Sequence, residues 1–244
     1  MKQGTFEIIS NIPLTDSVFR LDLSGDTSAV TAPGQFVEIA LPELFLRRPI
    51  SVFDRTGTTL SLIIKRVGRG TEALAGRKTG TLDILTGLGN GYDLAASGKE
   101  PLLIGGGVGV PPLYLLAKEL IGRGAKPSVI LGFNTKSELF CEEEFKALGI
   151  KTYVTTADGS CGQKGFVTDA MRQISYSYFY ACGPVPMLKS LTKTAATPGE
   201  MSLEARMGCG FGACMGCTVK TAEGPRRVCK EGPVFKKEVL VWED

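Results

Sequence analysis

The hydrophobic pattern of this 244-residue chain changes near residue 101, and this change constrains the fold more than any other feature. Before it, apolar and polar residues alternate in short runs that turn residues separate, as in Phe19–Leu23. Such runs are typical of strands with one buried face, in a small antiparallel barrel or sandwich. After it, short apolar runs alternate with segments of helical pattern, which is typical of a doubly wound parallel sheet. We therefore expect a multi-domain chain of the β plus α/β class.

Individual elements can be placed from the turn residues and the helix caps. Thr71–Gly76 is expected to be a short helix with Thr71 as its N-cap, because threonine caps helices and glycine ends them. In the second part, strands and helices are expected to alternate. The expected strands are Leu102–Ile104, Ser128–Phe133, Ile150–Thr156 and Tyr176–Ala181. The expected helices are Pro111–Ile121, Ser137–Leu148, Phe166–Ile174 and Pro184–Thr194.

The composition of 7 cysteines and 0 histidines excludes several kinds of site at once. A Rieske centre, a Ser-His-Asp triad and any zinc site with an imidazole ligand all require histidine. The formal net charge of +3 is too small to predict nucleic acid or an anionic membrane as a partner. Residues 1–11 show no secretory signal, so we expect a cytoplasmic chain with reduced thiols. Glycines and prolines interrupt the most apolar stretch, Pro101–Ala117, so no membrane-spanning helix is expected.

Four cysteines near the C-terminus carry the strongest signal in the sequence. They have the spacing C-x4-C-x2-C followed by x11-C, and they are Cys209, Cys214, Cys217 and Cys229. This spacing matches that of plant-type [2Fe–2S] clusters, in which each iron takes two thiolates. The glycines between these cysteines allow the backbone to fold tightly around such a cluster. The alternative is a zinc site with four thiolates, but such sites usually pair two C-x2-4-C motifs, and here Cys229 stands alone.

Two further segments have the pattern of phosphate-binding loops. Gly105–Pro112 follows a strand and precedes a helix, so its backbone N–H groups can face a pyrophosphate. It lacks the third glycine of the strict dinucleotide motif, and no acidic residue ends the second strand, so a plain glycine-rich turn is the alternative. The other segment, Arg47–Ser51, offers Arg48 as a fork of donors for a phosphate, and a surface loop is its alternative.

Taken together, these segments resemble the ferredoxin-NADP reductase-like flavoproteins. The shared motifs occur in the same order along the chain: Pro33–Val37, Arg48–Ser51, Gly70–Thr71, Gly87–Gly91, Gly106–Gly109 and Ala181–Pro184. With the cysteine segment appended, the chain is similar to the electron-transfer subunits of the two-subunit dihydroorotate dehydrogenases. The resemblance covers nearly the whole chain and implies three parts. They are an antiparallel FAD-binding β-barrel (residues 1–98), a doubly wound NAD-binding α/β domain (99–200) and a [2Fe–2S] cluster-binding segment (201–244).

The resemblance also implies which residues hold the cofactors. FAD would be held by Arg48 at the pyrophosphate, by Ser51 near the flavin ring, and by their neighbours Pro49, Ile50, Lys65, Arg66, Val67, Gly70 and Thr71. NAD would be held by Gly106, Gly107, Gly109, Cys182 and Gly183, with Cys182 where the nicotinamide meets the flavin. A small buried residue at a strand end is the alternative for this cysteine.

The activity implied by the resemblance is an electron relay in de novo UMP biosynthesis. A separate FMN-binding catalytic subunit would oxidise dihydroorotate, and this chain would pass the electrons through the [2Fe–2S] cluster and FAD to NAD+. Two copies of each subunit are implied, and no catalytic acid or base is expected in this chain. The alternatives are the small FAD/[2Fe–2S] subunit of a hydrogenase or of a ferredoxin-dependent NAD(P) oxidoreductase, and, in a different class, a zinc-bound module without a redox role.

Three further points stay open. NAD and NADP both remain candidates: Lys136 could reach a 2′-phosphate, whereas the resemblance favours NAD. Cys141 and Cys161 have no assigned role. The basic residues near the C-terminus are expected to form a solvated face, and a docking surface for an acidic partner is the alternative. These residues are Arg226, Arg227, Lys230, Lys236 and Lys237.

Overall fold

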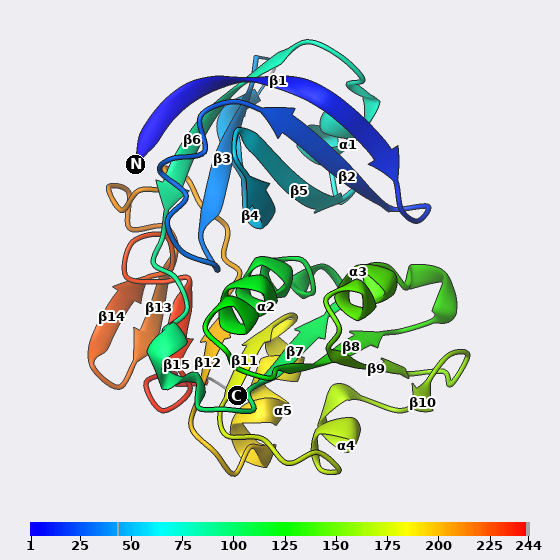
Figure 1. Cartoon of the computed structure of the whole chain (residues 1–244). Helices are drawn as coiled ribbons and strands as arrows, with labels where there is room; N and C mark the ends of the chain where they lie inside the picture. Colours follow the sequence, from blue (N-terminus) through cyan, green and yellow to red (C-terminus); the bar gives the residue numbers. More distant parts are fainter. Residues whose placement is uncertain (43, 243–244) are drawn as a thin grey trace.

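Six antiparallel strands close into a barrel in the computed structural model, which describes residues 1–42 and 44–242 (Figure 1). Their order around the barrel is β1-β2-β5-β4-β3-β6. They are β1 (Lys2–Pro13), β2 (Val18–Ser24), β3 (Phe36–Leu41), β4 (Leu44–Thr56), β5 (Thr59–Lys65) and β6 (Thr81–Leu88). Alternate side chains point inward, such as the fully buried Leu21 and Leu23 of β2. The predicted N-terminal antiparallel barrel is confirmed.

The segment Arg47–Ser51 lies inside the regular strand β4, so the alternative of a surface loop is wrong. β4 pairs with β3, with Ser51 opposite Phe36. Two consecutive arginines conceal the strand period in the sequence. Arg47 is accommodated in the barrel wall because its Nη2 donates to Oδ2 of Asp83 on β6 at 2.9 Å.

The short helix of the barrel, α1 (Arg69–Gly76), begins two residues before the expected N-cap. The hydroxyl of Thr71 accepts a hydrogen bond from the backbone N–H of Val67 at 2.9 Å. Thr71 therefore satisfies the helix N-terminus from within the first turn, and the expected cap position is wrong. The helix itself ends at Gly76 as expected.

The second part of the chain forms a seven-stranded sheet with the order β10-β9-β8-β7-β11-β12-β15 (Figure 1). Its strands are β7 (Leu102–Gly106), β8 (Ser128–Phe133), β9 (Lys151–Thr156), β10 (Gln163–Lys164), β11 (Phe179–Cys182), β12 (Gly199–Ser202) and β15 (Val234–Lys236). Neighbouring strands are parallel, except that β12 and β15 are antiparallel. The chain adds strands first on one side of β7 and then on the other, which is the doubly wound topology that the sequence predicts.

Helices cover both faces of this sheet (Figure 1). They are α2 (Pro112–Gly122), α3 (Glu142–Ala147), α4 (Val167–Met171) and α5 (Val185–Thr194), with short 3-10 turns η1 (Leu94–Ser97), η2 (Gly107–Gly109) and η3 (Lys136–Glu138). α2 and α3 share a hydrophobic cluster with Leu103 of β7 and with barrel residues. α4 and α5 share another with Ile104. Consecutive residues of β7 therefore point into two separate apolar layers, as expected for a parallel sheet that is buried on both faces.

Two of the helices are shorter than expected. Ser137–Leu148 divides into η3 and α3, because the buried side chains of Phe140 and Cys141 turn the chain between them. Cys141 has a left-handed backbone conformation, with φ of 65°. α3 then begins at Glu142 with acidic residues throughout its first turn, where the helix dipole favours them. The expected helix Phe166–Ile174 is likewise reduced to α4.

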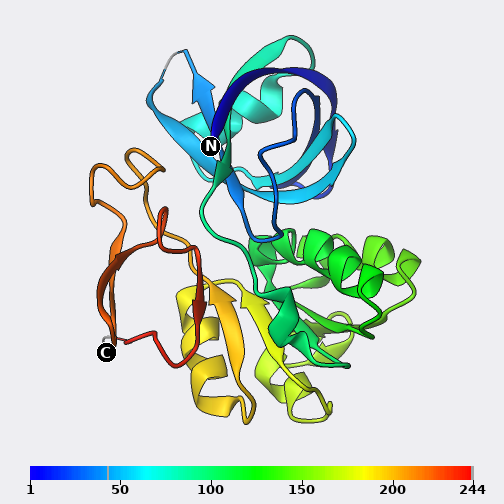
Figure 2. The same ribbon diagram turned by 60° about the vertical axis from the view of Figure 1, so that its left-hand side comes forward.

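The C-terminal segment joins the sheet and also carries a separate hairpin. β15 pairs with β12, whereas β13 (Thr218–Thr221) and β14 (Gly224–Arg227) form a two-stranded antiparallel sheet. Figure 2 shows this hairpin and the loop before it, in orange, which reaches toward the barrel. The expected domain boundaries at residues 98 and 200 stay predictions. No helix in the described part of the chain is long and apolar enough to cross a membrane.

Candidate functional site

The C-terminal hairpin brings the third and fourth cysteines of the motif together. Cys217 directly precedes β13, and Cys229 follows shortly after β14. Thr218 pairs with Arg227 across the hairpin, and the N–H of Val228 donates to the carbonyl of Cys217 at 3.0 Å. Both cysteines are buried, with exposed fractions of 3% and 2%. The x11 spacing is therefore the length of one hairpin.

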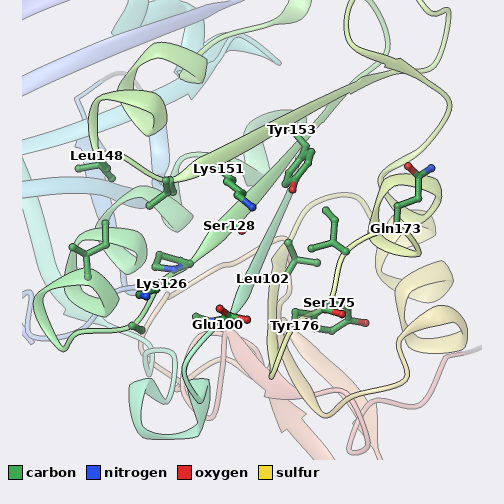
Figure 3. Close-up of a pocket in the computed structure, with 17 residues that line it drawn as sticks. Glu100, Leu102, Lys126, Ser128, Leu148, Lys151, Tyr153, Gln173, Ser175 and Tyr176 are labelled. Atoms are coloured by element: carbon green, nitrogen blue, oxygen red, sulfur yellow. The ribbon is translucent and has the colours of Figure 1, made fainter.

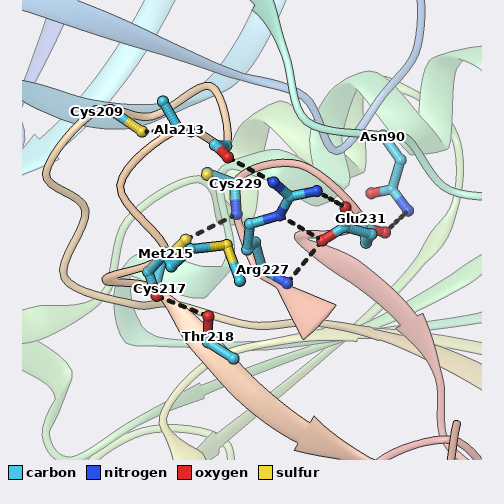
Figure 4. A network of polar contacts seen from close by, with 10 residues as sticks. Asn90, Cys209, Ala213, Met215, Cys217, Thr218, Arg227, Cys229 and Glu231 are labelled. Carbon is cyan, nitrogen blue, oxygen red and sulfur yellow. Dashed lines mark hydrogen bonds and ion pairs between the residues drawn. The ribbon is translucent and has the colours of Figure 1, made fainter. Parts of the chain in front are cut away.

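The other two cysteines, Cys209 and Cys214, lie on the loop before the hairpin, where Figure 4 shows Cys209 beside Ala213. The backbone N–H groups of Ala213 and Cys214 point at Sγ of Cys209, at 3.2 and 3.4 Å. The thiols of Cys209 and Cys214 also interact with each other. In the hairpin, the N–H of Cys229 points at Sγ of Cys217 at 3.4 Å. The four sulfurs are thus grouped in two pairs.

Two pairs of thiolates are the ligand arrangement of a [2Fe–2S] cluster, because each iron takes two of them. A zinc site would instead need four ligands that converge on one ion. Among residues 1–42 and 44–242, no three cysteine, aspartate or glutamate side chains converge in a way that would hold a single metal ion. The observed donor set therefore fits the [2Fe–2S] cluster better than zinc.

The loop backbone prepares the thiol of Cys209 for metal binding. Burial raises the pKa of this thiol, but the N–H groups of Cys214, Phe211 and Ala213 outweigh burial and lower the pKa to about 6. The thiolate is the form that binds a metal. Burial and the neighbouring thiol raise the pKa of Cys229 to about 12, so iron binding would have to displace that proton.

A buried acid of the barrel lies against the cluster loop, and the sequence analysis missed it. Glu38 is only 1% exposed, and a Cβ added at Gly210 would lie 2.2 Å from its Oε1 atom. That oxygen has no hydrogen-bond partner among the described residues. Burial raises the pKa of Glu38 to about 7, against the opposing effect of Arg47. The only signal in the sequence is alternation: Val37 and Ile39 face the barrel core, so Glu38 must face outward.

The residues predicted for FAD gather around β4 and the N-terminus of α1. The side chain of Arg48 packs against the backbone of Gly70. A Cβ added at Gly70 would lie 2.1 Å from the Nε atom of Arg48. Nη1 of Arg48 donates to the carbonyls of Leu46 and Arg47, at 2.6 and 3.1 Å. These contacts hold the guanidinium beside the first turn of the helix. A fixed cation at a helix N-terminus can bind a phosphate group.

The loop that leads into α1 adds further predicted residues to this place. Lys65, Arg66 and Val67 are exposed, and Thr71 holds the loop through the N–H of Val67. Together with Arg48, the two cations make this end of the barrel positive, which suits a pyrophosphate. The structure therefore brings the predicted FAD residues together, while their roles stay predictions.

The strand β3 connects the predicted flavin site with the cysteine segment. Ser51 of β4 pairs with Phe36 of β3. Phe36 belongs to the hydrophobic cluster that also contains Cys217 and Cys229. Glu38 of the same strand lies against Gly210 of the cluster loop, so β3 contacts both the predicted flavin strand β4 and the cysteine segment.

The residues predicted for NAD lie where the strand order reverses, at the carboxyl ends of β7 and β11. Gly105 pairs with Cys182, so the loops that follow these two strands are adjacent. A Cβ at Gly109 would lie 2.2 Å from the carbonyl oxygen of Cys182, and one at Gly106 would lie 2.6 Å from a methionine sulfur. Loop packing therefore requires glycine at position 109, where the close atoms are backbone, whereas the methionine side chain near Gly106 can move and Gly107, with φ of 52°, has open space around it. Doubly wound folds bind nucleotides in this crevice.

Cys182 is buried at the end of β11, directly before Gly183 and the N-cap residue Pro184 of α5. Burial, followed by the nearby Glu204, raises the pKa of its thiol to about 12. The thiol is therefore neutral at physiological pH. This environment agrees both with a nicotinamide contact and with a small buried residue at a strand end.

The glycine loop after β7 faces the barrel. Val108 and Val110 pack in the same hydrophobic cluster as Phe53 of β4 and Ile63 of β5. The predicted nicotinamide crevice therefore lies next to the joint between barrel and sheet, on the side of the strands that carry the predicted flavin residues.

A depression of about 650 Å³ lies at the opposite end of the sheet strands from the predicted NAD crevice (Figure 3). Its walls include Leu102, Ser128 and Lys151, which are the first residues of β7, β8 and β9. It therefore marks the amino ends of the strands, opposite to the edge where doubly wound folds bind nucleotides. None of the residues predicted for FAD, NAD or the cluster lines it.

The fold and the sites define an oxidoreductase of the ferredoxin-NADP reductase type with an added iron–sulfur segment. Among solved structures, the chain is similar to the NADH-dependent reduced ferredoxin-NADP oxidoreductase, with a TM-score of 0.89 and 32% identity over 98% of this chain and 90% of that one. It shares its fold with a ferredoxin NADP+ reductase from Neisseria gonorrhoeae with bound FAD and NADP. There the TM-score is 0.70, with 18% identity over 80% of this chain and 90% of the other.

Curated relatives and family models narrow this class. A "dihydroorotate dehydrogenase B (NAD(+)), electron transfer subunit" from Fusobacterium nucleatum is 43% identical over 96% of this chain and 97% of its own length. One from Geobacillus is also 43% identical, over 99% of both chains. Residues 204–241 match the iron-sulfur cluster binding domain of dihydroorotate dehydrogenase B, and residues 103–193 match the oxidoreductase NAD-binding domain. The chain belongs to the family of dihydroorotate dehydrogenase B electron transfer subunits.

Proposed function

We propose that this chain is the electron transfer subunit of an NAD-dependent dihydroorotate dehydrogenase that serves de novo UMP biosynthesis. It receives electrons from a catalytic subunit that oxidises dihydroorotate, and it passes them through a [2Fe–2S] cluster and FAD to NAD+. The observation that carries the proposal is that β3 pairs with the predicted flavin strand β4 and, through Glu38, lies against Gly210 of the cluster loop. When bound, the cluster exchanges one electron and FAD exchanges either one electron or a hydride. Together they can therefore carry electrons from dihydroorotate oxidation to NAD+.

In this proposal the barrel residues bind FAD and fix its position. Arg48 and the first turn of α1 hold the pyrophosphate, which the fixed position of the guanidinium over Gly70 supports. Ser51 lies near the flavin ring. It pairs with Phe36 of β3, the strand that lies against the cluster loop, and this supports a short path between ring and cluster. Lys65, with its neighbours before α1, adds positive charge at the phosphate end.

The glycine loop after β7 and the loop after β11 hold NAD in the crevice between them. Gly106 and Gly107 present backbone to the nucleotide, while Gly109 keeps the two loops in contact. Gly183 continues the second loop. The thiol of Cys182 borders the nicotinamide. It is neutral, because burial raises its pKa to about 12, and it acts there as a contact and not as an acid or base. NAD rather than NADP is favoured, because both relatives described above are NAD(+) enzymes by name.

The electron donor is a partner subunit that docks at the cluster loop. The exposed side chains of Phe211 and Met215 flank the exposed Cys214 on this loop, with exposed fractions of 44% and 52% for the two apolar residues. Exposed apolar side chains around a redox site support docking there. We propose that the partner binds FMN, that the assembly holds two copies of each subunit, and that it works in the cytoplasm.

A ferredoxin-dependent NAD(P) oxidoreductase is the second candidate. The observation that favours it is the match to the NADH-dependent reduced ferredoxin-NADP oxidoreductase structure over nearly the whole chain. In that case the same sites would exchange electrons with ferredoxin instead of a dihydroorotate-oxidising subunit.

Anaerobic titration of the purified complex tests the proposal and separates the two candidates. The complex is titrated with dihydroorotate, with NADH and with reduced ferredoxin, while flavin and cluster absorbance are followed. We expect dihydroorotate and NADH each to bleach both cofactors. Bleaching by reduced ferredoxin and NADH, with none by dihydroorotate, would contradict the proposal and favour the second candidate.

A further inference from the structure

An arginine of the hairpin supports the cluster loop (Figure 4). Arg227 is the last residue of β14, and its Nη1 donates to the carbonyl of Gly212 at 2.5 Å. Gly212 lies between Cys209 and Cys214, so this hydrogen bond ties the loop that carries one pair of cysteines to the hairpin that carries the other.

A glutamate fixes the orientation of this arginine. Nε of Arg227 donates to Oε2 of Glu231 at 3.0 Å, and Nη2 donates to Oε1. The same Oε2 accepts the backbone N–H of Arg227 at 2.7 Å. The carbonyl of Glu231 in turn accepts a hydrogen bond at 3.1 Å from Nδ2 of Asn90, in the segment between barrel and sheet. The guanidinium is therefore held between Gly212 and Glu231.

The positive end of this ion pair faces the buried cysteine pair. Arg227 pairs with Thr218 across the hairpin, so it lies beside the residue that follows Cys217 and two residues before Cys229. Figure 4 shows the guanidinium between Cys229 and the carboxylate of Glu231. The side chains of the pair are 27% and 26% exposed, so solvent screens them only in part.

We propose that Arg227 is a positioning residue of the [2Fe–2S] site, which fixes the cluster loop at Gly212 and raises the reduction potential by placing a permanent positive charge beside Cys217 and Cys229. A cluster that gains an electron gains negative charge, and a neighbouring cation stabilises that form. This inference rests on the [2Fe–2S] site of the proposed function.

The neighbouring Arg226 supplies a matched control. Its Nη2 contacts Glu223 at 3.2 Å, and its side chain is 40% exposed.

The basic residues near the C-terminus differ in their surroundings. Lys237 donates to the carbonyls of Ala195 and Thr197. The basic residues near the C-terminus therefore do not form the single solvated face that the sequence predicts, because Arg227 and Lys237 bind within the fold.

Reduction potentials of the cluster in the full complex test the proposal. Wild type, Arg227→Gln, Glu231→Gln and Arg226→Gln are compared by anaerobic redox titration with EPR detection, after iron and sulfide analysis. Arg227→Gln should lower the ratio of reduced to oxidised cluster at a fixed potential about tenfold, which is about 59 mV for one electron. Glu231→Gln should raise this ratio, because it removes the negative end of the pair. Arg226→Gln should leave it unchanged.

Shifts of opposite sign distinguish an electrostatic role from a merely structural one. Shifts of the same sign, or no shift in Arg227→Gln, would overturn the proposal. If Arg227→Gln loses the cluster, Arg227→Lys is measured instead, because it keeps the positive charge. A ratio of reduced to oxidised cluster near that of the wild type supports the proposal, and a ratio lowered about tenfold overturns it. If the wild-type complex itself contains no iron and sulfide, the proposed function fails together with this inference.

Discussion

Glu38 and Arg48, on neighbouring strands of the barrel, show how single side chains prepare the cofactor sites. Glu38 keeps an unpartnered carboxylate oxygen in a buried place against Gly210. Arg48 is held by two backbone carbonyls at the N-terminus of α1. A buried charge without a full set of partners lowers the stability of a fold. The buried position of Glu38 is therefore not explained by the stability of the barrel.

The Glu38→Gln variant should reveal the buried charge through pH dependence. Burial raises the pKa of Glu38 to about 7 in the folded chain, from the 4.5 of a free glutamate side chain. Because the folded pKa is the higher one, the contribution of Glu38 to stability is fully present below the unfolded pKa and is lost as the pH rises through the folded pKa. The loss is about 3 kcal/mol.

Thermal unfolding of both proteins at about pH 5 and about pH 8 measures this effect. The Tm of the wild type should fall relative to that of Glu38→Gln between the two conditions. Equal shifts of Tm in the two proteins would contradict a raised pKa at Glu38.

The Arg48→Ala variant should weaken FAD binding at least about tenfold, because a charge-assisted hydrogen bond to a phosphate is worth about 1.5–3 kcal/mol. Arg47→Ala is the control: Arg47 is bound to Asp83, so its loss should lower Tm and leave FAD affinity unchanged. Flavin titration of the two apoproteins measures the difference. Equal weakening in both variants would argue against the phosphate role of Arg48.

At the scale of elements, the loops after β7 and β11 depend on glycine for their close approach. Gly109→Ala places a Cβ 2.2 Å from the backbone oxygen of Cys182, so the loops must separate. Gly124→Ala, after α2 and outside the predicted sites, is the matched control, since its Cβ meets nothing within 4 Å and only the positive φ opposes it, at about 1 kcal/mol.

We therefore expect Gly109→Ala to lower Tm and raise the KM for NADH much more than Gly124→Ala does. NADH oxidation with a dye as acceptor and thermal unfolding give both quantities. Similar effects of the two substitutions would show that loop packing does not shape the crevice.

The elements that the sequence predicts well have local signals. The apolar runs of β7 and β8 are continuous, and the spacing of the cysteines is the length of one hairpin. β4 and α3 depend instead on distant partners. Arg47 fits a strand only because Asp83 lies beside it, and α3 starts late because Cys141 is drawn into the core. Glu38 likewise meets Gly210 only after the barrel and the C-terminal segment have packed together.

At the scale of the whole molecule, the C-terminal segment links the barrel to the sheet. β15 lies in the sheet, whereas the cluster loop reaches the barrel at Glu38. Asn90, between the two, donates to the carbonyls of Glu231 and Val234. The three predicted sites therefore follow one another from the exposed loop at Cys214 to the crevice between β7 and β11.

The Cys214→Ser variant should lose the iron–sulfur cluster and retain FAD, because the predicted FAD residues lie on β4, β5 and α1 of the barrel. Cys161→Ser, which changes a half-buried cysteine outside the motif, should retain both cofactors. Iron, sulfide and flavin analysis of the purified proteins checks this. Loss of FAD together with the cluster in Cys214→Ser would show that the two sites are not independent.

The relay itself is tested most directly by NAD+ reduction with dihydroorotate, in complexes of the catalytic subunit with wild-type or Cys214→Ser chain. The wild-type complex should form NADH. The variant complex should still oxidise NADH with a dye as acceptor, because it keeps FAD, but it should form no NADH from dihydroorotate. NADH formation at the wild-type rate by a complex that contains FAD and no iron would contradict electron transfer through the four cysteines.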